Sequence, residues 1–260
     1  MRCGRKEITN VKTPLGLLAI AISVCSPNAD AAVLASYTFS SSSDAATVLS
    51  GVTATNFTPS AGITGGSGGT AQNGFSTNAT VNTAPAASSQ PVRYVRGNSD
   101  SADTAAAITN GDYFSFTLTP TVGNQLNLQN ITIDISSNSS GTGGTAVANN
   151  SQFALVSSFN GFTPDSVTTA DVIGTAASIT SPDSAALSYT RYTIDLSGAA
   201  YQGLTSTTTF RLYVSNSNNQ GVARLDNVIV NGSVIPEPSA ALLGMVGMVT
   251  GLAIRRRKLA

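Results

Sequence analysis

The chain has 260 residues, with 13 basic and 13 acidic side chains, two cysteines and no histidine or tryptophan. The absence of histidine excludes Ser-His-Asp and Cys-His catalysis and zinc sites built on histidine and cysteine. Residues 32–235 contain ten Asp and five Arg but no Lys or Glu, so their net charge is 5 − 10 = −5, which argues against nucleic acid as a partner.

The N-terminus is typical of a secretory signal peptide, residues 1–31. Four basic residues precede an apolar stretch at 15–24 (LGLLAIAISV), and Ala29 and Ala31 give the small-x-small pattern that signal peptidase needs. We therefore expect a signal helix, export through the Sec machinery, and cleavage after Ala31. A buried N-terminal helix is the alternative, because ten apolar residues are too few to span a bilayer.

The region from 32 to 235 predicts an all-β fold, an antiparallel, jelly-roll-like β-sandwich. Short stretches alternate between apolar and polar residues, as strands with one buried face do, and no stretch predicts an amphipathic helix. In FRLYV, Phe210, Leu212 and Val214 share one face while Arg211 and Tyr213 share the other. The expected strands lie at 33–39, 113–119, 130–136, 153–158, 191–197, 210–215 and 227–232.

Two stretches depart from this regular pattern. Leu128 and Ile131 are three positions apart, so the alternation changes phase and predicts a bulge or turn near Asn130. Residues 59–91 form a low-complexity segment rich in Gly, Ser, Thr and Ala. It fits either a long surface loop or weak edge strands around Phe75 and Val81, since long structureless loops are unusual within compact domains.

The C-terminal segment, residues 236–260, combines three features. Pro236-Glu237-Pro238 predicts an extended, accessible backbone, because proline fixes φ and disfavours helix at the residue before it. Residues 239–254 carry no charge and would form a single transmembrane helix of about 24 Å. The basic stop Arg255, Arg256, Arg257 and Lys258 follows and would hold that end in the cytoplasm. The alternatives are an amphipathic or aggregation-prone tail and a Pro-rich linker.

The order of triplet, apolar stretch and basic cluster resembles the PEP-CTERM sorting signal of exopolysaccharide-producing bacteria. The resemblance implies that the tail holds an exported precursor in the inner membrane. It also implies that an exosortase, a membrane-embedded cysteine protease, then cuts near Pro236, Glu237 and Pro238. Segments such as 111–120, 194–204 and 223–232 look like the β-sandwich passengers of this family, although Asn160 stands where the family usually has Asp. The final strand also resembles that of lectin-like and carbohydrate-binding jelly rolls.

The lectin-like resemblance implies a calcium site at Asp226 and Asn227 in the closing strand, because carboxylate and amide oxygens suit this ion. Asp100, Asp103 and Asp112 are the next candidates. A structural role for Asp226, bonded to backbone or to Arg224 and Arg211, is the competing interpretation. No other cofactor is expected.

Glycan binding needs apolar ring faces beside polar groups. The tyrosines that offer such faces are 94, 113, 189, 192, 201 and 213. Their alternative role is packing in the core or across strands.

These features predict a non-catalytic exported protein that is anchored transiently in the inner membrane and delivered to the cell surface or extracellular matrix. No carboxylate pair marks a glycosidase acid/base couple, so we expect no enzyme. The runner-up is a lectin-like module that binds exopolysaccharide, and a glycan-active enzyme is a distant third.

Overall fold

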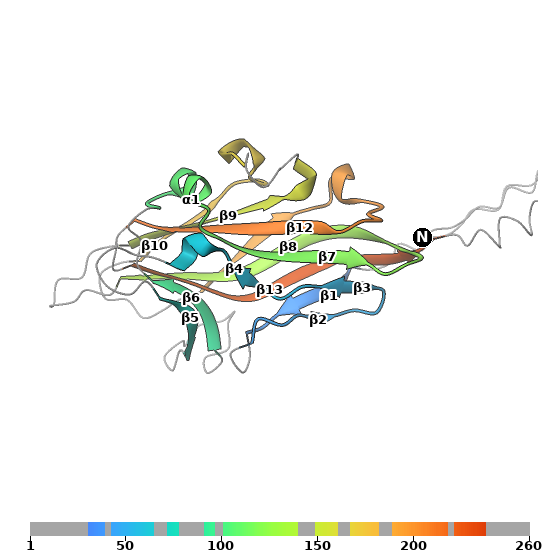
Figure 1. The fold of residues 1–260 in the computed structure, drawn as a ribbon, viewed down its shortest axis with the longest axis horizontal. Coiled ribbons are helices and arrows are strands. Elements are labelled where there is room, and N and C mark those ends of the chain that lie inside the picture. The colour runs from blue at the N-terminus through green and yellow to red at the C-terminus, as the bar shows by residue number, and fades with distance from the viewer. Residues whose placement is uncertain are drawn as a thin grey trace, which may run out of the picture.

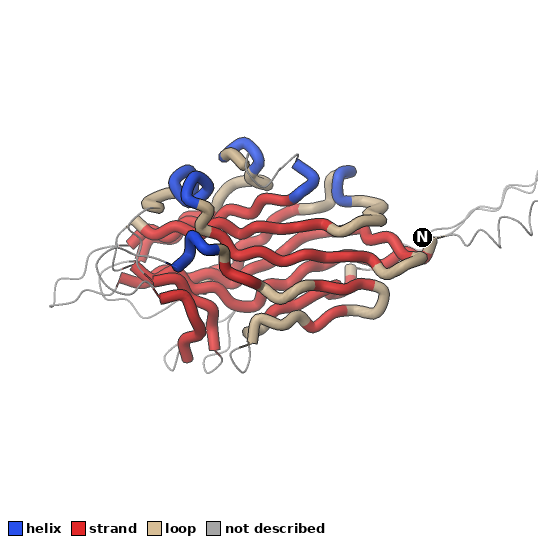
Figure 2. The backbone as a smooth tube through the Cα atoms, viewed as in Figure 1, coloured by secondary structure: helices blue, strands red, loops and turns tan. Residues whose placement is uncertain are grey.

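Two antiparallel β-sheets pack face to face in the computed structural model (Figures 1 and 2). It describes residues 31–39, 43–64, 72–77, 91–96, 101–139, 149–160, 167–181, 189–217 and 221–237. The predicted all-β antiparallel sandwich is therefore confirmed. The chain crosses repeatedly between the sheets, as from β7 to β8 and from β12 to β13, so residues distant in sequence meet on one sheet face.

In the described residues one sheet has seven strands and the other has six. The seven-stranded sheet has the order β11-β8-β13-β1-β2, with β6 also pairing with β13 and β5 with β6. The six-stranded sheet has the order β10-β9-β12-β7-β3, with β4 also pairing with β7. The first comprises β1 (Ala32–Tyr37), β2 (Thr47–Val48), β5 (Gln72–Thr77), β6 (Pro91–Arg96), β8 (Asn124–Ser139), β11 (Thr190–Asp195) and β13 (Gly221–Pro236). The second comprises β3 (Val52–Ala54), β4 (Thr58–Pro59), β7 (Tyr113–Pro120), β9 (Asn149–Ser157), β10 (Ala177–Ser181) and β12 (Thr208–Asn216).

The core lies between the sheets and is rich in aromatic rings. Strand β7 alternates half-buried and buried residues along its whole length, and its inward side chains include Phe114 and Phe116. Phe57 stacks on Phe114 with ring centroids 5.0 Å apart, and Phe116 stacks on Phe210 at 5.2 Å. Each such side chain contributes about 1.5–3 kcal/mol by leaving water. Tyr37, on β1 of the other sheet, lies 5.3 Å from Phe116 between ring centroids, so the aromatic cluster packs the two sheets against each other.

The phase change predicted near Asn130 is a bulge in β8. Along β13, Asn231 pairs with Asn130 but Gly232 pairs with Leu128, which leaves Gln129 as the extra residue. Leu128 and Ile131 therefore both face the core despite their spacing. The prediction of a bulge or turn at this place is confirmed.

The low-complexity segment at 59–91 contains a strand around one of the two expected residues. Strand β5 includes Phe75 and pairs only with β6 among the described strands, so it is an edge strand. Val81 lies outside the described residues. The prediction of an edge strand is therefore confirmed around Phe75.

A short helix, α1 (Thr104–Asn110), occurs between the two ends, where no stretch of the sequence predicts an amphipathic helix. Asp103 caps its N-terminus by accepting the Ala106 N–H at 2.9 Å, and Gly111 closes it in the left-handed conformation. Seven residues give too little periodicity for detection, but these two capping residues are a recognisable signal. Single 3₁₀ turns also occur at η2 (Ala61–Thr64), η3 (Ser158–Asn160), η4 (Thr169–Asp171) and η5 (Ala199–Tyr201).

Most of the two predicted sorting segments lies outside the described residues. These are residues 1–30, with Ala29, and residues 238–260, with Pro238, the apolar stretch 239–254 and the basic cluster 255–258. Ala31, Pro236 and Glu237 are described, and Pro236 is the last residue of β13. None of the helices in the described part of the chain has the length and apolar character that crossing a bilayer requires.

Candidate functional site

The predicted pair Asp226 and Asn227 lies where strand β13 exchanges one neighbouring strand for another. Val222–Leu225 pair with β6, whereas the strand from Val228 onward pairs with β1. Between them the ladder with β8 shifts register, and Asn227 adopts a left-handed backbone with φ of 47°. Asparagine tolerates this conformation better than most residues. The local sequence therefore forms a bulge that turns the Asn227 side chain away from the regular alternation.

Asp134 is the residue directly opposite Asp226 on strand β8. Its neighbours Ile133 and Ile135 enter the core, so the alternation of β8 turns Asp134 to the outer face of the seven-stranded sheet. Asp134 is nevertheless fully buried, and Asp226 is only 2% exposed. The sheet thus covers two carboxylates that face each other across neighbouring strands.

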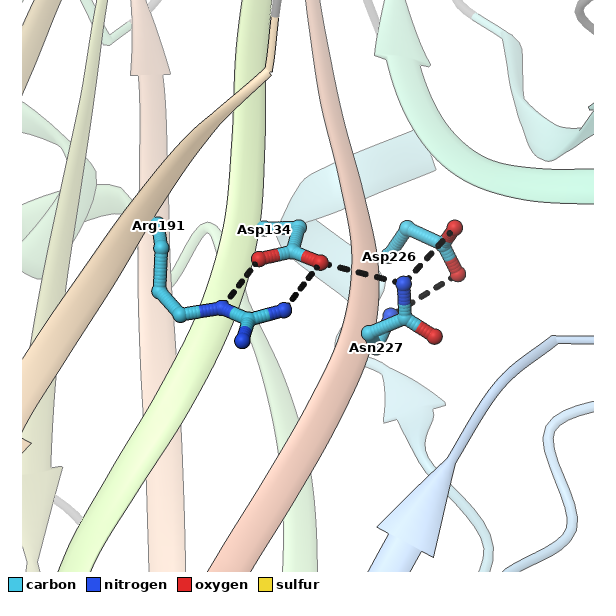
Figure 3. A network of polar contacts seen from close by, with 4 residues as sticks. All are labelled: Asp134, Arg191, Asp226 and Asn227. Atoms are coloured by element: carbon cyan, nitrogen blue, oxygen red, sulfur yellow. Dashed lines mark hydrogen bonds and ion pairs between the residues drawn. The ribbon is translucent and has the colours of Figure 1, made fainter. Parts of the chain in front are cut away.

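Arg191 covers Asp134 from the edge strand β11, where it is the paired residue in the ladder. Its Nε donates to Asp134 Oδ1 at 2.8 Å, and its terminal Nη2 donates to Oδ2 at 2.9 Å (Figure 3). This two-pronged geometry matches the planar guanidinium to the planar carboxylate. The Arg191 side chain is 46% exposed, so it joins a buried anion to the solvent-facing surface.

The Asn227 amide links the two carboxylates. Its nitrogen donates to Asp134 Oδ2 at 3.0 Å and to Asp226 Oδ2 at 3.3 Å (Figure 3). The Asn227 backbone N–H donates to Asp226 Oδ1 at 2.8 Å. Each carboxylate therefore has donors on both of its oxygens, and we call these four residues the carboxylate network: Asp134, Arg191, Asp226 and Asn227.

The electrostatics of the network differ between its two halves. Burial raises the pKa of Asp226 to about 6, the Asn227 backbone N–H opposes this increase, and the Asp134 charge adds to it. For Arg191, the hydrogen bond to Asp134 raises the pKa further above its usual range. One half is the ion pair between Arg191 and Asp134. The other half is Asp226, whose ionised form is disfavoured by burial.

The groups that face outward are not the carboxylates. Only two of the five N–H donors of Arg191 bind Asp134, and in the described part of the chain the other three have no hydrogen-bond partner. The half-buried Asn227 uses its amide nitrogen inside the network, and its amide oxygen accepts no hydrogen bond within the described residues. A ligand on this face would meet guanidinium donors and an amide acceptor.

The calcium prediction for Asp226 and Asn227 stays a prediction. The two residues are adjacent, and Asp134 adds a second carboxylate at the same place. However, the Asn227 amide nitrogen occupies the position between the carboxylates, so its oxygen would reach a bound ion only after the amide rotates. Within the described residues, no three His, Cys, Asp or Glu side chains gather as a metal-binding group.

The second set of calcium candidates has local structural roles. Asp103 caps helix α1, and Asp112 accepts a hydrogen bond from the buried Ser101 hydroxyl. Asp100 lies outside the described residues. The geometry gives Asp103 and Asp112 functions in fixing the segment around α1.

Most of the tyrosines considered for sugar stacking are occupied elsewhere. Tyr189, Tyr201 and Tyr213 are buried, and Tyr192 packs partly against the core while its hydroxyl donates to the Thr175 carbonyl at 2.7 Å. Tyr113 is half-buried under Arg211, whose guanidinium carbon lies 4.4 Å from the ring centroid. The remaining candidate, Tyr94, pairs in the ladder with Arg224, two residues before Asp226.

No protein-family model matches this chain, and no curated protein matches it either. Among solved structures, the CBM22-1 xylan-binding domain from Paenibacillus barcinonensis Xyn10C has 12% identity and a TM-score of 0.37, over 80% of this chain and 97% of that domain. A non-crystalline cellulose-specific carbohydrate-binding module, CBM28, has 12% identity and a TM-score of 0.36, over 65% and 86%.

The Stig cyclase Fisc from Fischerella sp. TAU has 15% identity and a TM-score of 0.35, over 73% of this chain and 87% of the cyclase. These similar structures thus include both carbohydrate-binding modules and a cyclase. Likenesses this distant assign neither a family nor a ligand nor an activity to the chain.

Proposed function

We propose that this chain is a non-catalytic, exported β-sandwich protein that binds polysaccharide on the outer face of its seven-stranded sheet. The observation that carries this proposal is the carboxylate network. Two buried carboxylates fix Arg191 and Asn227, which offer N–H donors and an amide oxygen on one surface. Sugars present hydroxyl groups that both donate and accept, and a few rigid polar groups are the usual way in which proteins orient such ligands.

Rigid positioning supports binding because a ligand then orders fewer side chains when it associates. The bulge at Asn227 and the two-pronged ion pair at Asp134 restrict the two outward-facing groups before any ligand arrives.

The burial of the carboxylates argues for binding rather than hydrolysis. A glycosidase needs two carboxyl groups that contact the scissile bond, whereas Asp134 is fully buried and Asp226 is 2% exposed. The raised pKa of Asp226 alone does not make it a general acid, because a proton donor must reach the leaving group. The network therefore functions as support for the binding surface.

Affinity electrophoresis of the full-length protein in mild detergent tests polysaccharide binding. Gels containing neutral polysaccharides, an acidic polysaccharide and the producer's own exopolysaccharide would be compared. We expect at least one to retard the wild type, and Arg191→Gln to remove that retardation. Arg211→Gln is the matched control, because Arg211 lies on the six-stranded sheet. An unretarded wild type refutes glycan binding, and equal losses in both variants refute this site.

Export and exosortase processing form the second part of the proposal, and the order of the sequence features at both ends supports them. One structural observation favours cleavage at the triplet. Pro236 and Glu237 are exposed at the end of β13, beyond Val234, the last residue of β13 that packs against the core. A cut there would leave the sandwich core intact, as release to the cell surface or matrix requires.

The mass of the protein isolated from its producing cells tests this second part. A chain that starts at Ala32 and ends near Pro236-Glu237-Pro238 is expected from signal peptidase and exosortase. A full-length chain in the cytosol, with its first methionine and last alanine, would refute export without bearing on glycan binding.

A further inference from the structure

One end of the sandwich carries the exposed large hydrophobic side chains of the described residues. Large hydrophobic residues are exposed at five positions, and their exposures range from 38% to 103%. They occur at the start of β1, along β2 into the β2–β3 turn, in the β7–β8 turn and at the end of β13. The five are Val33, Val48, Leu49, Val122 and Ile235.

Backbone contacts bring these segments together around the point where the chain leaves the sandwich. The Thr121 N–H donates to the Gly51 carbonyl at 3.0 Å, which joins the β7–β8 turn to the β2–β3 turn. The Glu237 N–H donates to the Gly123 carbonyl at 2.8 Å, which joins the end of β13 to the same turn. We call residues 31–33, 48–52, 120–124 and 232–237 the apolar end, which lies at the right of Figure 1.

The apolar end is almost free of charge. Of the residues that form it, only Glu237 has an ionisable side chain, and the adjacent segment 196–207 has no charged side chain. That segment lies against β8 through the paired Leu126 and Leu204. Contact of this end with an apolar phase would therefore require little desolvation of charge, which is normally the largest obstacle to such contact.

The sequence after Glu237 indicates which apolar phase lies nearby. Pro238 follows, and the charge-free stretch begins at residue 239, so only one residue separates the last described residue from it. The two steps along the chain from residue 237 to residue 239 span at most about 7 Å. If the stretch begins in a bilayer, Glu237 at the apolar end lies within about 7 Å of that membrane.

We propose that the apolar end is a lipid-contacting surface that seats the sandwich directly on the bilayer holding the C-terminal tail. This inference rests on the proposed export and membrane anchoring. Val33, Val122 and Ile235 would enter the interfacial layer, and Glu237 would remain among the headgroups. The carboxylate network would then lie away from the membrane contact, because it is on the outer face of the seven-stranded sheet and not at this end.

The test uses the full-length chain with Cys3 and Cys25 replaced by serine, reconstituted in vesicles of phosphatidylethanolamine and phosphatidylglycerol. An environment-sensitive fluorophore is attached to Val122→Cys, or to Ala102→Cys as a control. Ala102 is exposed near the far end of β12, whose Asn216 N–H donates to the Ser101 carbonyl at 3.1 Å. We expect a blue shift at position 122 and loss of its emission with headgroup quenchers, but neither effect at position 102.

Flotation of the vesicles separates the two proposals. If the protein floats with the vesicles but both labels report water, the lipid-contacting surface is refuted while the anchor stands. If the protein does not float, the anchor and the surface both fail. If the label at position 122 shifts equally without lipid and cross-links to a second copy, the apolar end is a protein interface and our inference is wrong.

Discussion

Replacing Asp226 by Asn should stabilise this protein at neutral pH, although the substitution removes a residue with several hydrogen bonds. Asp226 is 2% exposed, and its carboxylate receives the Asn227 backbone N–H. Asparagine has the same shape and can accept this bond through its amide oxygen. The main change is the loss of a negative charge that burial and Asp134 disfavour.

The size of the effect follows from the pKa shift. The pKa of Asp226 rises from 3.8 to about 6 in the folded protein. At pH values between these two pKa values, the folded state keeps a proton that the unfolded chain has released. The free energy of unfolding therefore falls as the pH rises through this range. By pH 7 the whole penalty is present, about 3 kcal/mol for a difference of roughly two units.

The net gain is smaller than this penalty. The substituted amide loses the 3.3 Å bond from Asn227 and gives a weaker neutral hydrogen bond, which together offset about 1 kcal/mol. A gain of about 1–2 kcal/mol remains, which should raise the Tm by several degrees for a domain of about 200 residues. At pH 4 wild type and variant should melt at nearly the same temperature.

Melting curves between pH 4 and 8 in EDTA provide the measurement, with Asp195→Asn as the matched control. Asp195 is exposed, and hydrogen bonds from Ser197 lower its pKa. Its pKa shift is therefore opposite in direction to that of Asp226. Its contribution is therefore nearly constant over the assayed range and disappears only at lower pH, as the pH falls through its folded pKa, so the Asp195→Asn curve should run parallel to the wild-type curve. If the Asp226→Asn curve runs parallel to the wild-type curve, burial does not penalise the Asp226 charge and our reasoning is wrong.

Four further outcomes are expected. Asp134→Asn should destabilise the protein by about 2 kcal/mol in urea unfolding, less than for a fully buried ion pair because the Arg191 side chain is 46% exposed. Phe57→Ala should cost about 3–5 kcal/mol in the same assay by opening a cavity among the core rings. Asn227→Ala should be about 1 kcal/mol less stable than Asn227→Gly, since both lose the amide but only alanine is strained at a φ of 47°. The calcium prediction expects added calcium to raise the Tm of the wild type but not of Asp226→Asn, because a bound ion stabilises only the folded state.

The sequence predicted the central strands well because they alternate over many residues. Strands β7 and β12 are confirmed at the expected positions, and the phase change in β8 correctly indicated its bulge. The shortest strands were missed because two or three residues carry no period, as in β2 and β3. Their pairing depends on partners elsewhere in the chain, which local patterns do not reveal.

The candidate site was predicted only in part. Asp226 and Asn227 were named, but Asp134 lies 93 residues from Asn227 in the sequence, and Arg191 lies 57 residues from Asp134. Only the register of three neighbouring strands brings them together. The alternation of NITIDIS does turn Asp134 away from the core, so its outward position was readable while its partners were not.

Within the carboxylate network, Asp226 makes sense physically as support for a surface and not as a source of stability. An apolar residue in place of Asp226 would avoid the penalty of a buried charge, and such replacements of buried ionic groups are often neutral or stabilising. What Asp226 supplies is position: it binds the Asn227 backbone N–H and shares the Asn227 amide with Asp134. That amide oxygen and the Arg191 donors are the parts of the network that a ligand can reach. If Asp226→Asn raises the Tm but weakens retention on polysaccharide, the buried charge of Asp226 lowers stability and at the same time orients the groups that bind the ligand. If stability rises and retention is unchanged, the orientation of Asn227 has no part in recognition.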